Sequence, residues 1–196
     1  HHLRSAHDLT VGNLFLEETL EKTIQSYIAI DNNVPLAMLR KNPALLTDEQ
    51  WQKSFERIMG NDKCYALQHF GSLPTDELLA KMRYLAYGAG CDFIILDHLS
   101  LVFSGQANDN ERIAIDNAMT ELAAFCNESG VGIITVVHLS RNKAKGSFNE
   151  GAEISLNDLR GSAALEQLSW NVLGLERSQQ AEDEEAKNTS RIRILK

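Results

Sequence analysis

Short apolar runs in this chain alternate with longer stretches in which apolar residues recur every three or four positions. The predicted strands are residues 11–16, 93–96 and 131–137, which are apolar runs, and residues 64–68, 171–175 and 191–195, which mix apolar and polar residues. A continuous apolar run of this length, bounded by turn residues, is typical of a strand that is buried on both faces of a parallel sheet. The pattern therefore predicts six strands.

Helical periodicity fills most of the intervals between these runs. The helical segments are the end of a helix at residues 1–8, a helix at 19–30, a polar region at 34–60 that prolines divide, a helix that opens at Thr75, and a long helix at 111–129. Within the polar region, Thr47 and Gln50 have the spacing of a capping box. Strands that alternate with helices predict an α/β fold with a mostly parallel central sheet, covered by helices on both faces.

Residues suited to chemistry occur at the ends of three predicted strands. Glu17 follows the first strand, Asp97 follows the run at 93–96, and His138 follows the run at 131–137. The carboxyl ends of parallel strands lie along one edge of a sheet, where open α/β sheets bind their ligands. We therefore expect these three side chains to converge on one ligand.

Each of the three residues suits one step of nucleotide hydrolysis. A carboxylate at Glu17 can take a proton from an attacking water, Asp97 can hold a hydrated magnesium ion, and His138 can sense a terminal phosphate. Each also has a simpler interpretation. Asp97 could cap the next turn, Glu17 could be an acid favoured at a helix N-terminus, and His138 could be a hydrogen-bonded histidine at a strand end. Their joint occurrence at strand ends favours a shared site.

Two basic segments follow the fourth strand. Arg141, Lys143 and Lys145 lie among small residues, and such a loop can contact a phosphodiester backbone through its cations and its free amide groups. A solvated surface loop is the alternative. Further along, Arg160 and Gly161 stand at an apparent helix start, where backbone amides and an arginine can bind a phosphate.

The bulk composition limits the classes of protein to consider. The 196 residues are 43% hydrophobic and 23% charged, which is ordinary for a soluble globular domain. The net charge of -8 means that a nucleic-acid site must be a local basic patch. The three widely spaced cysteines form no CxxC pair, which argues against a zinc site or a disulfide scaffold. With no long apolar span and no signal peptide, we expect no membrane association and a cytoplasmic location.

Six segments, taken in order, resemble the hexameric replicative DNA helicases with a RecA-like core. The likeness is strongest to the helicase half of phage-type primase–helicases, relatives of the mitochondrial replicative helicase. The segments are LFLEET (14–19), CDFIILDHLSLV (91–102), VVHLS (136–140), DLRGSAAL (158–165), GLERSQQ (174–180) and RILK (193–196). The resemblance covers nearly the whole chain and implies a RecA-like three-layer sandwich.

The resemblance also implies a role for each candidate residue. Glu17 matches the catalytic carboxylate, with Glu18 as the weaker candidate, Asp97 matches the magnesium-associated acid, and His138 matches the residue that reports the γ-phosphate to the DNA loop. The remaining matches are single-strand DNA contacts at Arg141, Lys143, Lys145, Arg160 and Gly161, and nucleotide contacts at Arg177 and Lys196. ATP or another NTP with Mg²⁺, single-stranded DNA, a homo-hexameric ring, and a primase and a replicative polymerase are the implied cofactors and partners.

Two departures from the family pattern concern the ends of the sequence. The Gly-x-x-x-x-Gly-Lys-Ser/Thr loop is absent from residues 1–196, and the sequence stops two residues short of the expected arginine finger. We therefore expect residues 1–196 to be a RecA-like core truncated at both ends, which does not hydrolyse ATP well by itself. The alternatives are a RecA-like recombinase or signalling ATPase, and a non-enzymatic nucleic-acid-binding remnant.

Overall fold

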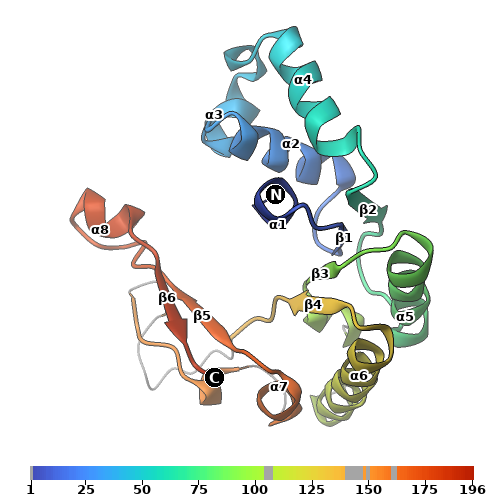
Figure 1. The fold of residues 1–196 in the computed structure, drawn as a ribbon. Helices are drawn as coiled ribbons and strands as arrows, with labels where there is room; N and C mark the ends of the chain where they lie inside the picture. Colours follow the sequence, from blue (N-terminus) through green and yellow to red (C-terminus); the bar gives the residue numbers. More distant parts are fainter. Residues whose placement is uncertain (1, 104–107, 140–147, 149–150, 160–162) are drawn as a thin grey trace. The chain divides into compact units, whose positions relative to one another are not determined.

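Four of the predicted strands form one parallel sheet. The computed structural model of the chain describes residues 2–103, 108–139, 148, 151–159 and 163–196. Its strands β1 (Val11–Phe15), β2 (Cys64–Gln68), β3 (Phe93–Asp97) and β4 (Gly132–Thr135) pair in the order β2-β1-β3-β4, and every pairing is parallel (Figure 1). The predicted α/β fold with a mostly parallel sheet is thereby confirmed. The fourth strand is shorter than the apolar run at 131–137, since it ends at Thr135.

The chain divides into two compact units. The first unit comprises residues 1–104 and 125–136 and contains the parallel sheet, and the second comprises residues 105–124 and 137–196. The long helix α6 (Asn108–Ser129) contributes its last turn to the first unit and the rest to the second. This helix begins three residues before the predicted start at residue 111.

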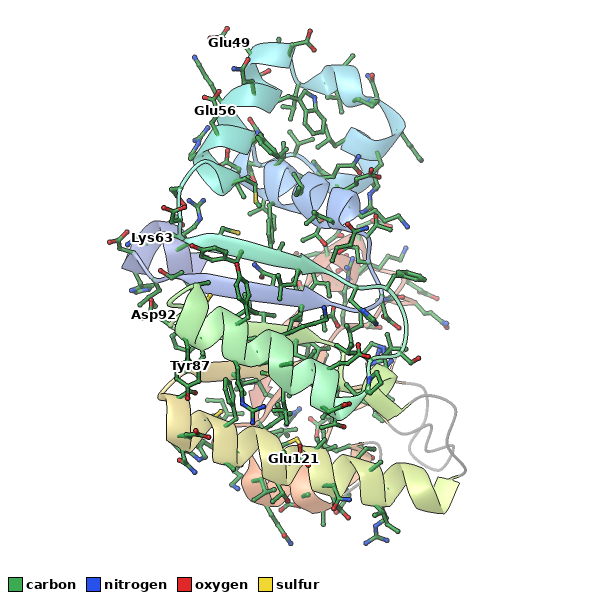
Figure 2. The ribbon with its side chains drawn as sticks, turned by 90° about the vertical axis from the view of Figure 1, so that its right-hand side faces the viewer. Glu49, Glu56, Lys63, Tyr87, Asp92 and Glu121 are labelled. Atoms are coloured by element: carbon green, nitrogen blue, oxygen red, sulfur yellow. The ribbon has the colours of Figure 1, made fainter. Side chains whose placement is uncertain are left out.

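Helix α5 (Thr75–Arg83), extended by the π-helical turn η2 (Tyr84–Gly88), packs on the sheet through one apolar face. Leu78, Leu79, Met82 and Leu85, which the sequence pattern places on this face, are all buried. The helix lies close to β1 because Gly12 has no side chain: a Cβ there would lie 2.8 Å from Leu85 Cδ1. The short helix α1 (His2–His7) precedes β1, and Lys63 and Asp92, which precede β2 and β3, lie at the amino end of the sheet (Figure 2).

A group of three helices is inserted between β1 and β2 and has a small core of its own. Its members are α2 (Leu20–Asp31), α3 (Leu36–Lys41) and α4 (Asp48–Met59), and α2 and α4 contact β2. Buried apolar residues from all three helices form the core, which comprises Ile28, Ala29, Leu39, Leu46 and Ile58. The predicted capping box is confirmed, because Thr47 Oγ1 accepts from the Gln50 amide at 3.2 Å and Gln50 Oε1 accepts from the Thr47 amide at 2.8 Å.

The last two predicted strands form a separate antiparallel ribbon. Strand β5 (Leu173–Glu176) pairs with β6 (Arg191–Ile194), so the part of the chain that the structure describes has four parallel strands and not six. The segment between these two strands contains the short helix α8 (Glu184–Asn188), which the Asp183 side chain caps. Helix α7 (Ala163–Leu168) precedes the ribbon.

A buried carboxylate holds this ribbon together. Glu176 accepts hydrogen bonds from Arg193 Nε at 2.7 Å, from Arg193 Nη2 at 3.3 Å and from the Ile154 amide at 2.8 Å. Arg193 also pairs with Glu153 at 2.8 Å. The two bonds from Arg193, followed by the bond from Ile154, lower the pKa of Glu176 from its ordinary value. The carboxylate therefore joins both strands to the segment before them.

Two smaller findings bear on the earlier expectations. Cys64, Cys91 and Cys126 are all free thiols, as their spacing predicts. Among the residues that the structure describes, no helix combines the length and the apolar character that crossing a membrane requires.

Candidate functional site

The carboxyl ends of β1 and β3 lie side by side, and two of the predicted site residues belong to them. The parallel register places Phe15 opposite Asp97, which is the last residue of β3. The pairing continues one step further, since the Leu16 amide donates to the Asp97 carbonyl at 2.6 Å. Glu17 follows directly. The structure thus brings the backbones of Glu17 and Asp97 together at one sheet edge, and the convergence of their side chains on a ligand stays a prediction.

Glu17 extends its carboxylate toward the residue after Asp97. Its Oε1 lies 2.6 Å from Nε2 of His98, and its side chain is 51% exposed whereas that of His98 is 6% exposed. Glu17 therefore combines access to solvent with one fixed hydrogen bond. These are properties that a base for an attacking water requires.

The neighbouring Glu18 has a different environment. Its Oε1 pairs with Arg40 Nη2 of α3 at 3.3 Å, and its Oε2 accepts from Thr23 Oγ1 of α2 at 3.4 Å. Both of its oxygens are engaged in holding the helical insertion to the end of β1. Of the two adjacent glutamates, Glu17 is the better candidate for chemistry.

The Asp97 side chain suits a hard divalent cation. It is a half-buried carboxylate at the carboxyl end of a central strand, and carboxylate oxygens are the ligands that Mg²⁺ prefers. The donor chemistry at this position therefore fits a magnesium ion bound with nucleotide phosphates. No other described residue is needed for this fit, because Mg²⁺ commonly keeps several waters and takes one or two carboxylates.

His138 is not the end of a strand. It lies three residues beyond β4 and belongs to the second unit. Its convergence with Glu17 and Asp97 stays a prediction. The sequence pattern placed His138 directly after the strand because the apolar run continues through Val137, two residues past the last residue of β4 that pairs with β3.

The predicted DNA contacts fall outside the described residues. These are Arg141, Lys143 and Lys145 in the cationic loop, and Arg160 with Gly161 further along. The structure does describe residues that precede both segments, since Leu139 and Leu159 form an isolated antiparallel bridge. The residues directly before the two basic segments are thus paired with each other.

The two predicted nucleotide contacts of the second unit lie at opposite ends of the β5–β6 ribbon. Arg177 follows β5, and its Nε donates to the Lys187 carbonyl at 2.5 Å. Lys196 follows β6 beside Val172, and its Nζ donates to the carbonyls of Glu166 and Gln167 at the end of α7, at 2.7 and 3.2 Å. Arg177 is five residues along the strand from Val172, or roughly 17 Å at the rise of a strand. The structure therefore does not bring these residues together.

One residue at the site is missing from the sequence-based set. His98 lies inside the CDFIILDHLSLV segment, directly after Asp97, yet nothing in the local pattern marks it as a partner of Glu17. The signal that could have found it is the parallel pairing itself. If the ends of β1 and β3 are neighbours, His98 is within reach of Glu17.

Comparison with known proteins gives one family over the whole sequence. The family model described as DnaB-like helicase C terminal domain matches residues 1–196. The DNA helicase/primase of Enterobacteria phage T3 is 36% identical over 187 residues, which is 95% of this chain and 32% of that protein. The replicative DNA helicase DnaB of Geobacillus stearothermophilus is 26% identical over 185 residues, which is 92% of this chain and 39% of that protein. The chain thus spans about a third of the length of these relatives.

Two solved structures share the fold. One, described as an ATPase domain, aligns with a TM-score of 0.78 at 22% identity, covering 98% of this chain and 68% of that one. A DnaB-like replicative helicase, described with its interactions with primase, aligns with a TM-score of 0.80 at 21% identity, covering 98% of this chain and 46% of that one. These likenesses confirm the predicted RecA-like fold.

Proposed function

The chain belongs to the family of DnaB-like helicase C-terminal domains, and from this premise we propose that it is the NTP-hydrolysing part of a replicative DNA helicase. The whole protein couples hydrolysis of ATP or another NTP to movement along single-stranded DNA and to unwinding of the duplex. The observation that carries the proposal is the pair of acidic residues, Glu17 and Asp97, at the adjacent ends of β1 and β3. A recombinase or a signalling ATPase of similar fold is disfavoured, because the helicase family model matches residues 1–196.

In this proposal the two acids have separate tasks. Glu17 takes a proton from the attacking water, for which its exposure to solvent is suited. Asp97 holds the magnesium ion of the bound nucleotide, and this ion supplies positive charge beside the phosphates. His138 senses the terminal phosphate.

Single-stranded DNA binds through the two basic segments. Arg141, Lys143 and Lys145 provide phosphate contacts in one segment, and Arg160 with Gly161 provides them in the other. The bridge between Leu139 and Leu159 supports this, because it brings together the starts of both segments. A local basic surface of this kind is compatible with the net charge of -8.

The nucleotide lies between adjacent subunits of a homo-hexameric ring in the cytoplasm. The positions of Arg177 and Lys196 at opposite ends of one ribbon support this arrangement, since each can then serve a different nucleotide. A primase and a replicative polymerase are the further partners.

The proposal is tested by Glu17→Gln in the full-length protein. We expect DNA-stimulated hydrolysis to fall by about 100-fold or more, because the amide cannot accept a proton from water. Nucleotide binding, measured by equilibrium titration, should change little because Glu17 does not hold the phosphates.

Glu18→Gln is the matched control, since it removes the same charge at the neighbouring position. Its carboxylate is engaged with Arg40 and Thr23, so hydrolysis should stay within about threefold of wild type. Wild-type turnover in Glu17→Gln would defeat the proposal and would favour the non-enzymatic remnant. A larger loss in Glu18→Gln than in Glu17→Gln would also contradict the assignment.

A further inference from the structure

The proposed function assigns no role to His98, although this residue contacts Glu17. Glu17 Oε1 and His98 Nε2 are 2.6 Å apart, although the two residues are separated by 81 positions in the sequence. We propose that His98 is a positioning residue that orients the Glu17 carboxylate toward the attacking water. The inference rests on the proposed function, because it assigns Glu17 as the base.

His98 is suited to this role because it is fixed more firmly than its partner. Its side chain is buried, at 6% exposed, and its backbone leads directly from the last residue of β3. The Leu99 amide, one residue on, donates to the Val136 carbonyl at 3.1 Å, and the His98 carbonyl accepts from the Leu101 amide at 3.2 Å. The imidazole is thus held at a defined place beside the end of β1.

Glu17 by contrast needs such an anchor. It lies outside the strand, half of its side chain is in solvent, and a free glutamate side chain samples many rotamers. One hydrogen bond from a buried donor restricts these rotamers before the nucleotide arrives. Catalysis by a general base depends steeply on such placement.

The chemistry of the contact leaves the base able to act. An ionised carboxylate has only acceptor sites, so the imidazole Nε2–H donates and Oε1 accepts. Among the described residues, the contact with His98 occupies Oε1 of Glu17, and Oε2 remains available for a water proton. Glu18 shows the contrasting arrangement, since partners occupy both of its oxygens.

The test compares His98→Leu with His98→Gln in the full-length protein. Leucine fills the buried site without a donor, and we expect kcat to fall by about 10- to 100-fold with KM for the nucleotide within about twofold. The glutamine Nε2 can replace the imidazole donor, so His98→Gln should recover most of the lost kcat. Equal losses in the two variants would overturn the inference, and so would wild-type kcat in His98→Leu. A rise in kcat would do so too, since the contact would then be restraining the base.

Two further variants separate this inference from the proposed function. In a Glu17→Gln background, adding His98→Leu should lower the residual kcat by less than about twofold, because the histidine acts through the carboxylate. A full additional loss would overturn the positioning role. His69→Leu is the matched control, since His69 follows β2 and contacts the Ser72 carbonyl at 2.9 Å. If Glu17→Gln keeps wild-type turnover, the proposed function fails; if it is inactive while His98→Leu is normal, only the inference fails.

Discussion

Two adjacent glutamates with opposite environments are the finding of most consequence at the scale of single residues. The sequence alone predicts an acid after β1, because a carboxylate follows a buried apolar run. The local pattern does not separate Glu17 from Glu18, and only the resemblance to the helicases favoured Glu17, since the environments of the two carboxylates arise from partners that are distant in the chain. Arg40 is 22 positions from Glu18, and His98 is 81 positions from Glu17. Tertiary pairing of the strands and docking of the inserted helices decide which carboxylate is more open to solvent.

Arg160 offers a test of the DNA interface at the same scale. Arg160→Ala should weaken single-strand binding at all sequences and should reduce the slope of log K against log salt by about one, because one phosphate contact is lost. Binding titrations at several salt concentrations measure this slope. The control is Lys53→Ala, which removes a cation paired with Glu49 on α4. An unchanged slope in Arg160→Ala, or an equal change in both variants, would count against a phosphate contact.

At the scale of elements, local pattern located most helices and strands but not their pairing. The starts of β1, β2 and α4 and the extent of β3 follow from apolar runs and a capping box, so they agree with the structure closely. The apolar run of β4 is longer than the strand, because apolar residues continue after the ladder with β3 ends at Thr135. The antiparallel ribbon was missed because the residues that define it, Glu176 and Arg193, look like ordinary surface charges in the sequence.

The ribbon makes its own prediction about stability. Glu176→Gln should lower the thermal midpoint by several degrees at neutral pH, because Arg193 loses the buried one of its two carboxylate partners and keeps only the exposed Glu153. The Arg193 interaction lowers the pKa of Glu176 in the folded state, so the unfolded state binds the proton more tightly. The stabilisation is therefore present above the ordinary glutamate pKa and is lost as the pH falls through the lowered value.

Thermal melts over a series of pH values measure this effect. The difference between wild type and Glu176→Gln should be largest near neutral pH and should shrink under acidic conditions. Glu185→Gln, on the exposed surface of α8, is the control and should leave the melting curve unchanged. A difference that is independent of pH would contradict the role of the ionised carboxylate.

At the scale of the whole molecule, the family could be recognised from six short segments, because their order and spacing are far more specific than any one of them. The comparisons confirm this family and the RecA-like fold. The fold brings the ends of β1 and β3 together, and in this account the side chains of Glu17 and Asp97 at these ends have different tasks. This division is the central claim.

The most direct test is the Mg²⁺ dependence of nucleotide binding in the full-length protein, measured by titration for wild type, Asp97→Asn and Glu17→Gln. The account predicts that Asp97→Asn loses the Mg²⁺-dependent part of the affinity, because the ligand to the ion is gone. Glu17→Gln should keep the wild-type dependence although it does not turn nucleotide over. Wild-type Mg²⁺ dependence in Asp97→Asn, or an equal loss in Glu17→Gln, would contradict the claim.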